Sequence, residues 1–415
     1  MTGIPTGWRR YAGFGIGRSN WLLVAAQTCY FMGTTIDMTL TAIVGLSLAP
    51  TPALATVPLA SITVVGMFAS IAAGLLAGRF GYVRVMIGCA LMAVFGAGVS
   101  VFAVTTESFL LLCCGTALAG AYRPIGGYIR YMAADRAPAG QRERVLSFVL
   151  YGGLVAAFIG PFMATTSAGF FAVRYTGAYM MVGVYAVLII LLLLALRATD
   201  VGPKVEVEKP TPLPVSEVRG KREFRIGLLV LASAGGMMTM IMAVGPLGSH
   251  HAEHAPTLGA AIIQWHLVGM FAPGIISGNV LARIGAYRTA IIGVALFLAG
   301  AISGVLGDEF VHFLLALTFN GIGWNFLYLA GTTLLVRCYP PGRGARIQAV
   351  AEGVRSATAV AASLSASTIF VFLGWQGTNV PVLVLSVLLL VVLLVVYRTS
   401  ARASGDVVHS EAKES

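Results

Sequence analysis

The stretch GLLAGRFGYVR at residues 74–84 recurs later in the chain as GNVLARIGAYR at residues 278–288. The two copies align without gaps, and each lies between the second and third apolar segments of its half of the chain. A weaker similarity pairs APAGQRER at 137–144 with PPGRGAR at 340–346 in equivalent loops. The repeat therefore predicts two related halves. The matched positions are Gly74 with Gly278, Arg79 with Arg283, Gly81 with Gly285, and Arg84 with Arg288.

The composition is that of a protein that crosses a lipid bilayer many times. Of the 415 residues, 58% are hydrophobic and 10% are charged, and the mean hydropathy is +0.87. A soluble domain does not contain so much apolar sequence. The apolar run after Trp21 is longer than the core of a signal peptide and lacks a small-residue cleavage site. We therefore expect it to remain as a membrane helix.

Twelve apolar segments have membrane-spanning length, which predicts an all-α polytopic membrane protein. The polar, proline-containing stretch 197–225 predicts a cytoplasmic linker between an N-terminal half at 1–196 and a C-terminal half at 226–397. Residues 398–415 are polar and predict a disordered cytoplasmic tail. The segments are 20–47, 57–76, 85–104, 108–133, 145–167, 175–196, 226–247, 258–282, 289–306, 310–337, 347–373 and 380–397.

The positions of Lys and Arg predict how the chain is oriented. With the N-terminus in the cytoplasm, the inward loops, the linker and the tail hold almost all of these residues, and the outward loops keep Arg174. Positive charge marks the cytoplasmic side. Both termini are therefore expected in the cytoplasm, with the chain in a bacterial inner membrane. The net charge of +11 is explained by these loops, so we expect no nucleic-acid partner.

The repeat and the twelve segments resemble the major facilitator superfamily. Residues 74–84 are similar to the loop signature G-x3-D-R-x-G-x-R of that family, with Gly78 where an acidic residue is usual. The resemblance implies two pseudo-symmetric six-helix halves that give access to each side of the membrane in turn. No nucleotide-binding loop, nucleophile elbow or catalytic carboxylate pair is found in the sequence. We therefore expect a transporter, not an enzyme, that functions as a monomer without a permanently bound cofactor.

Two short motifs predict a metal path. MTMIM places Met238 and Met242 four residues apart, and HLVGM places His266 and Met270 four residues apart. This spacing puts both members of a pair on one face of a helix. Thioether sulfur and neutral imidazole favour Cu(I) over hard cations. Methionine at helical spacing also occurs as ordinary packing, but a histidine inside hydrocarbon indicates function.

The two motifs fall at similar depths in antiparallel segments. Counted from the outer ends of the segments, Met238 lies about 13 Å deep and Met242 about 7 Å deep. His266 lies about 12 Å deep and Met270 about 18 Å deep by the same rise per residue. We therefore predict that the four residues form one translocation site in the outer half of the membrane, approaching its middle.

The outward loop between these segments reads GSHHAEHAP and contains His250, His251 and His254. A short histidine-rich tract is typical of metal binding, although a solvated loop can also carry histidines. The tract lies at the mouth of the predicted site. We therefore consider it a candidate for capturing metal on the periplasmic side.

MTMIM and WHLVGMFAPG resemble the M-x-x-x-M and H-x-x-x-M motifs of the CcoA-type copper importers. These are major facilitator proteins that supply copper for the biogenesis of haem-copper oxidases. The resemblance implies that Met238, Met242, His266 and Met270 are the copper ligands and that copper is the transported substrate. A close branch of the same family resembles riboflavin importers, which implies a second candidate substrate.

Two charged residues inside apolar segments leave other readings open. Asp37 could carry a coupling proton or attract a cation, or it could face water at a helix end. Arg123 would favour an anionic organic solute over a bare cation if it lines the cavity. The alternatives to copper import are therefore an importer of riboflavin or another small organic solute, and a membrane copper receptor that does not transport.

Other polar residues lie in the apolar segments of the C-terminal half. Glu352 and Arg355 are three residues apart and predict an intrahelical ion pair. Asn320, Trp324 and Asn325 fall in one segment and could line a cavity for either class of substrate.

Overall fold

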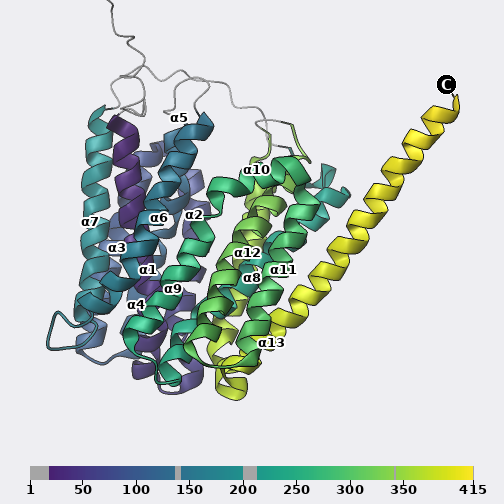
Figure 1. Cartoon of the computed structure of the whole chain (residues 1–415). Coiled ribbons are helices and arrows are strands. Elements are labelled where there is room, and N and C mark those ends of the chain that lie inside the picture. Colours follow the sequence, from purple (N-terminus) through teal and green to yellow (C-terminus); the bar gives the residue numbers. More distant parts are fainter. Residues whose placement is uncertain (1–17, 136–141, 200–212, 341–342, 415) are drawn as a thin grey trace, which may run out of the picture.

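The computed structural model describes residues 18–135, 142–199, 213–340 and 343–414, and this part of the chain is helical apart from turns and short connections. Figure 1 shows the helices as a bundle, with α1–α7 on one side, α8 and α10–α13 on the other, and α9 beside α6. The N-terminal helices are α1 (Arg18–Leu48), α2 (Val57–Phe80), α3 (Tyr82–Thr105), α4 (Phe109–Gly120), α5 (Arg123–Asp135), α6 (Arg142–Ser167) and α7 (Thr176–Thr199). The C-terminal helices are α8 (Arg222–His251), α9 (Pro256–Phe271), α10 (Gly274–Ile284), α11 (Ala286–Leu306), α12 (Phe310–Val336) and α13 (Ala345–Glu414).

Two of the predicted spans are each broken into two helices. The span predicted at 108–133 forms α4 and α5, and the span predicted at 258–282 forms α9 and α10, which meet at 42°. Proline explains both breaks, since Pro124 and Pro273 have no N–H to donate to the preceding turn. Among the described residues, nine helices are long and apolar enough to cross a membrane, and the bent pair makes a tenth.

The remaining two predicted spans come from α6 and from the second arm of α13. The helix α6 covers the span predicted at 145–167. Gly374 divides α13 into two arms, with a φ of 65° at the bend. These arms correspond to the spans predicted at 347–373 and 380–397, so the described helices account for all twelve predicted segments.

The two copies of the repeat have the same backbone conformation at their central glycine. Gly81 joins α2 to α3 with φ 83° and ψ 149°, and Gly285 joins α10 to α11 with φ 82° and ψ 167°. Both φ values are in a region that side chains rarely adopt. Arg84 and Arg288 follow at exposed positions. The burial of Gly74 and the side chain of Arg79 are outside what the structure describes.

Gly285→Ala should lower the stability of the protein, and Gly278→Ala should not. A Cβ atom at either glycine meets nothing within 4 Å, so the difference comes from backbone conformation alone. With φ 82° and ψ 167°, the backbone at Gly285 costs alanine about 1–3 kcal/mol, whereas Gly278 lies inside α10, where alanine is favoured by about 1 kcal/mol. Thermal unfolding of the two purified variants in detergent checks this. Equal melting temperatures would contradict it.

The two halves are joined by hydrogen bonds at the end of the bundle that the sequence assigns to the outside. Thr56 at the start of α2 donates through Oγ1 to the Ser363 carbonyl at 2.8 Å and also lies 2.9 Å from Ser367 Oγ in α13. The Ser367 hydroxyl donates in turn to the Ala53 carbonyl at 2.5 Å. All three hydroxyl-bearing side chains are buried. The two halves are therefore in direct contact at this end, between α2 and α13.

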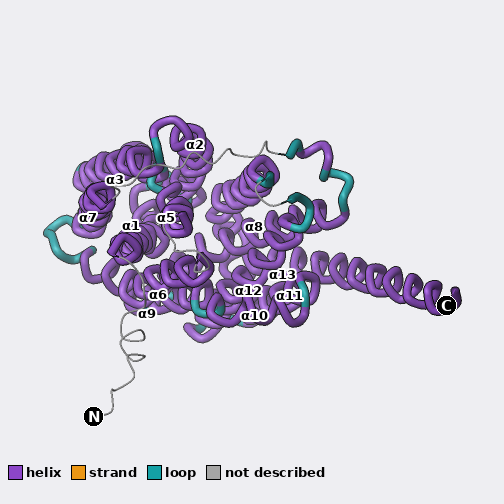
Figure 2. Tube along the Cα trace, turned by 90° about the horizontal axis from the view of Figure 1, so that it is seen from above, coloured by secondary structure: helices purple, strands orange, loops and turns teal. Residues whose placement is uncertain are grey.

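Apolar side chains cover the outside of the bundle, as expected for a chain in lipid. Phe95, Leu110 and Phe372 are each more than 70% exposed. Such surfaces are avoided in soluble monomers and are stable in hydrocarbon. Seen from above in Figure 2, the last part of α13 extends away from the other helices.

The structure differs from the prediction in the tail. A disordered segment is predicted at 398–415, but α13 continues as a helix through Glu414. No proline follows Tyr397, so nothing in the sequence removes a backbone donor from the helix there. Of the predicted linker 197–225, residues 200–212 lie outside the described part of the chain.

Candidate functional site

The four predicted copper ligands lie inside the C-terminal half, on α8 and α9. Met238, Met242 and Met270 belong to one contiguous core cluster, and their exposed fractions lie between 3% and 7%. His266 is fully buried. We call these four residues the sulfur–imidazole cluster. It is closed to solvent in this structure, so a solute could reach it only after the surrounding helices move.

A single turn of α12 connects the two motifs. His266 Nδ1 lies 2.9 Å from the Leu317 carbonyl, and Asn320 Nδ2 donates to the Met237 carbonyl at 3.4 Å. Leu317 and Asn320 are three residues apart and therefore lie on one face of α12. Met238 and His266 thus approach the same turn of a third helix, which agrees with the similar depths predicted from the sequence.

The hydrogen bond to Leu317 determines the protonation of the neutral imidazole. A carbonyl oxygen can only accept, so Nδ1 carries the proton and donates it to Leu317. The unprotonated nitrogen is then Nε2, which is buried and has no hydrogen-bond partner. In a metal-binding histidine, one ring nitrogen usually donates to a carbonyl or carboxylate that fixes the ring, and the other nitrogen is left free for the metal.

Close packing of glycine holds α9 against α12. A Cβ atom at Gly321 of α12 would lie 2.2 Å from the His266 carbonyl oxygen and 3.1 Å from the Met270 nitrogen. The Met270 carbonyl accepts a hydrogen bond of 2.8 Å from Asn325 Nδ2. The backbone of both motif residues on α9 is therefore positioned by α12.

Two of the three outer histidines line one pocket between the halves. His250 and His254 line this pocket, of about 50 Å³, together with Arg174 and residues of α1, α6, α8 and α9. His254 Nδ1 lies 3.3 Å from Ser249 Oγ. His251 is placed differently, with its ring edge-on to Phe370 at 5.8 Å between centroids. The structure thus brings His250 and His254 together and separates His251 from them.

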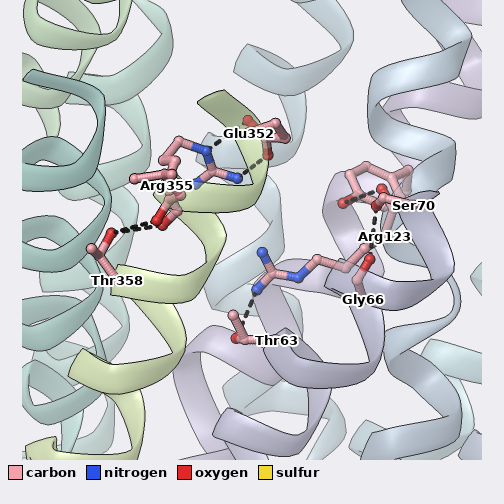
Figure 3. Close-up of polar contacts among 9 residues, drawn as sticks. Thr63, Gly66, Ser70, Arg123, Glu352, Arg355 and Thr358 are labelled. Atoms are coloured by element: carbon pink, nitrogen blue, oxygen red, sulfur yellow. Dashed lines mark hydrogen bonds and ion pairs between the residues drawn. The ribbon is translucent and has the colours of Figure 1, made fainter. Parts of the chain in front are cut away.

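Asp37 and Arg123 line a second pocket, which lies within the N-terminal half. Asp37 is buried in α1 and not at a helix end facing water. Arg123 begins α5, directly after the break that follows α4. The carbon stem of Arg123 passes Gly66, and Nη2 lies 3.4 Å from Thr63 Oγ1 (Figure 3). Tyr30, Thr34 and Tyr122 complete the polar lining of this pocket.

The predicted ion pair between Glu352 and Arg355 is confirmed. Both Nε and Nη2 of Arg355 donate to the two oxygens of Glu352 within α13. Figure 3 shows Arg123 extending from the N-terminal half toward this pair in the C-terminal half. Charged side chains of both halves therefore face each other across the interface.

Sequence reasoning missed Tyr30 and Tyr122. Their rings lie 5.1 Å apart at 36°, although the two residues are far apart in sequence. Tyr30 lies close to α5 because Gly126 has no side chain there, and a Cβ atom would lie 2.3 Å from the tyrosine ring. The Gly–Gly pair at 126–127 was the available signal for a close approach to this helix.

The comparison with known families agrees with the architecture. Residues 22–274 match the family described as the Major Facilitator Superfamily. The chain belongs to this superfamily. Its members are generally transporters, not enzymes, and the chain is accordingly a secondary transporter that crosses the membrane several times.

Several relatives cover nearly the whole chain. A riboflavin transporter, RfnT of Brucella anthropi, is 28% identical over 90% of this chain and 94% of its own length. An uncharacterised transporter of this type, YddS of Bacillus subtilis, is 24% identical over 91% of this chain and 90% of its own. Among solved structures, the nucleoside transporter NupG is similar with a TM-score of 0.68 at 12% identity, over 92% of this chain and 99% of its own. This last similarity concerns the fold alone.

Proposed function

We propose that this chain imports copper into the bacterial cytoplasm through the sulfur–imidazole cluster, from an inner membrane in which both of its termini face the cytoplasm. The observation that carries the proposal is the buried Nε2 of His266, which has no hydrogen-bond partner among the described residues. The three methionines of the two motifs are buried and belong to one core cluster. An uncharged nitrogen ligand and sulfur ligands together make a site for a soft cation.

The types of ligand narrow the choice of metal. Among the described residues, no three His, Cys, Asp or Glu side chains gather into a group that could hold a metal ion. A site for Zn²⁺ or Mg²⁺ would use such groups. Any metal that passes here must therefore bind mostly to thioether sulfur, which favours Cu(I). Thioethers carry no proton, so the ion can be bound and released without deprotonation of a ligand. The imported metal would serve the biogenesis of haem-copper oxidases.

The experiment that tests the proposal is uptake by the purified chain in sealed proteoliposomes. Radioactive copper, supplied with a reductant, and riboflavin are offered separately, and empty liposomes are the control. Accumulation of copper inside the vesicles supports import. Copper that binds to the protein and does not enter the lumen would indicate a receptor. Riboflavin accumulation with no copper signal would exclude the copper proposal.

A second candidate function is the import of riboflavin or another small organic solute. Two observations favour it: the similarity to a riboflavin transporter along most of the chain, and the position of Arg123 on an internal pocket. A guanidinium group repels a bare cation and donates hydrogen bonds to organic oxygen atoms. In this case the sulfur–imidazole cluster is part of the packed core.

The outer histidines should lower the copper concentration needed for uptake. Replacing His250 and His254 by Ala should raise the concentration that gives half-maximal uptake, because these two residues line the outer pocket. His251→Ala is the matched control, since its ring packs on Phe370. Uptake measured over a range of low copper concentrations distinguishes the variants. If the chain with His250 and His254 replaced takes up copper as the unmodified chain does, these histidines have no role in capture.

A further inference from the structure

The pocket around Arg123 contains buried polar groups that the protein itself leaves unpaired. Within the described part of the chain, neither the Tyr122 hydroxyl nor Arg123 Nε has a hydrogen-bond partner, and both atoms are buried. Arg123 Nη2 donates a hydrogen bond of 3.4 Å to Thr63 Oγ1. Asp37 is 8% exposed and accepts a hydrogen bond of 3.4 Å from Thr41. Buried donors and acceptors without partners are costly, so their presence together indicates a missing ligand.

Opposite charges share this pocket without pairing directly. Asp37 and Arg123 both line one small pocket, and among the described contacts no hydrogen bond or ion pair joins them. Across the interface, Glu352 and Arg355 neutralise each other. The pocket is therefore neutral overall, with an acceptor-only carboxylate in one part and a donor-only guanidinium in another. A bare cation or a simple anion would be repelled by one of the two groups.

A solute that fits this arrangement is neutral and carries a hydrogen-bond acceptor beside a donor. The edge of a lactam or cyclic imide, with a carbonyl next to an N–H, has this pattern. Its carbonyl would accept from Arg123 and its N–H would donate to Asp37. The rings of Tyr30 and Tyr122, 5.1 Å apart, offer aromatic surface beside these groups, which suits a flat heterocycle.

The position of the pocket in the fold supports the same reading. Tyr122 and Arg123 lie at the break between α4 and α5. Transporters of this general build place solutes at interrupted helices, where polar backbone and side chains are free to make contacts. Figure 3 shows the guanidinium of Arg123 directed into the space between the halves.

We propose that the pocket formed by Tyr30, Asp37, Tyr122 and Arg123 binds a neutral planar heterocycle through a lactam or imide edge. This inference deepens the second candidate function and rests on it. It is independent of the sulfur–imidazole cluster, which lies on α8 and α9 of the other half.

The test is ligand binding to the purified full-length chain in detergent, measured by titration calorimetry. The probes are riboflavin, uridine and hypoxanthine, compared with 3-methylriboflavin and 3-methyluridine, in which the N–H of the imide is blocked. At least one unmethylated probe should bind, and methylation should weaken its binding about 10- to 100-fold. Failure of all three unmethylated probes to bind would overturn the proposal, and so would equal binding of a probe and its methylated form.

Variants of the chain identify the pocket as the site. Arg123→Gln should weaken binding of the probe by a similar factor. Gly66→Ala keeps the charge but places a Cβ atom 2.7 Å from Arg123 Cγ, so it should displace the guanidinium and also weaken binding. Met237→Leu is the control and should bind normally, since Met237 is buried on α8 and belongs to neither motif. Unchanged binding by a folded Arg123→Gln variant would overturn the proposal.

The outcomes separate this inference from the proposed functions. Copper uptake without binding of any heterocycle would refute the proposed heterocycle site and would leave the copper-import proposal unaffected. Uptake of riboflavin that is insensitive to both methylation and Arg123→Gln would keep an organic-solute transporter and refute this site. Loss of probe binding both when the probe is methylated and when Arg123 is replaced by Gln supports the inference, whether or not the chain also transports copper.

Discussion

Replacement of His266 by Leu is expected to reduce copper uptake by at least about tenfold, which is the loss typical of groups that support a metal site. The variant removes Nε2, the unpaired nitrogen of the sulfur–imidazole cluster, and replaces the imidazole with an apolar side chain of similar volume. It also leaves the Leu317 carbonyl without its donor. Some stability should therefore be lost together with uptake, and the amount of folded protein must be measured in parallel.

Met242→Leu gives a cleaner form of the same test. Leucine conserves the apolar volume of methionine, and such exchanges in a core cost less than about 1.5 kcal/mol. The thioether disappears while packing is retained. Met237→Leu is the matched control, because Met237 is buried on the same helix but its sulfur lies 3.4 Å from the Ser386 hydroxyl and it belongs to neither motif.

The measurement is radioactive copper uptake by cells expressing each variant at equal membrane levels, with riboflavin uptake in parallel. We expect background uptake for His266→Leu and Met242→Leu and full uptake for Met237→Leu. Normal copper uptake by both motif variants would show that the cluster is ordinary packing. Equal losses in all three variants would point to a general defect of the core.

The architecture was accessible from the sequence because it depends on local patterns. Apolar runs of spanning length correspond to helices in a bilayer, and the repeat predicted equivalent positions in the two halves. The agreement at Gly81 and Gly285 reaches the level of backbone angles. The pair of Glu352 and Arg355 could also be predicted, since it requires no more than helical spacing.

The interruptions in the helices were harder to predict from hydropathy. Apolar residues continue through the breaks that precede Arg123 and follow Met270, so the segments read as uninterrupted spans. Pro124 and Pro273 were visible signals, but proline is tolerated in membrane helices and does not by itself define a break. The structure was needed to show that the charged pocket adjoins one of these interruptions.

The contacts that define the candidate sites depend on tertiary packing. The sequence indicated that the two motifs share a depth, but it contained no sign that Leu317 would bind His266 through its backbone. The proximity of Tyr30 and Tyr122 likewise depends on how α1 crosses the break between α4 and α5. Residue types indicate which chemistry is available, and packing decides which of those groups remain unpaired.

Gly321→Ala is expected to be among the most disruptive single changes in the C-terminal half. The new Cβ atom would lie 2.2 Å from the His266 carbonyl oxygen, which belongs to backbone and cannot rotate away. The helices α9 and α12 must separate, although they are also held by the hydrogen bond between Asn325 and the Met270 carbonyl. Overpacking of this kind costs typically about 1–3 kcal/mol, and more where backbone must move.

The matched control is Gly236→Ala on α8. There the nearest atoms to a Cβ would be the Thr358 side chain at 3.7 Å and the Thr358 carbonyl at 3.8 Å, which are ordinary contacts. Thermal unfolding in detergent should show a clear decrease in melting temperature for Gly321→Ala and little change for Gly236→Ala. Similar melting temperatures for the two variants would mean that α9 does not rest on α12 as described. Because His266 and Met270 both lie on α9, the same displacement should abolish copper uptake even where folded Gly321→Ala protein is recovered.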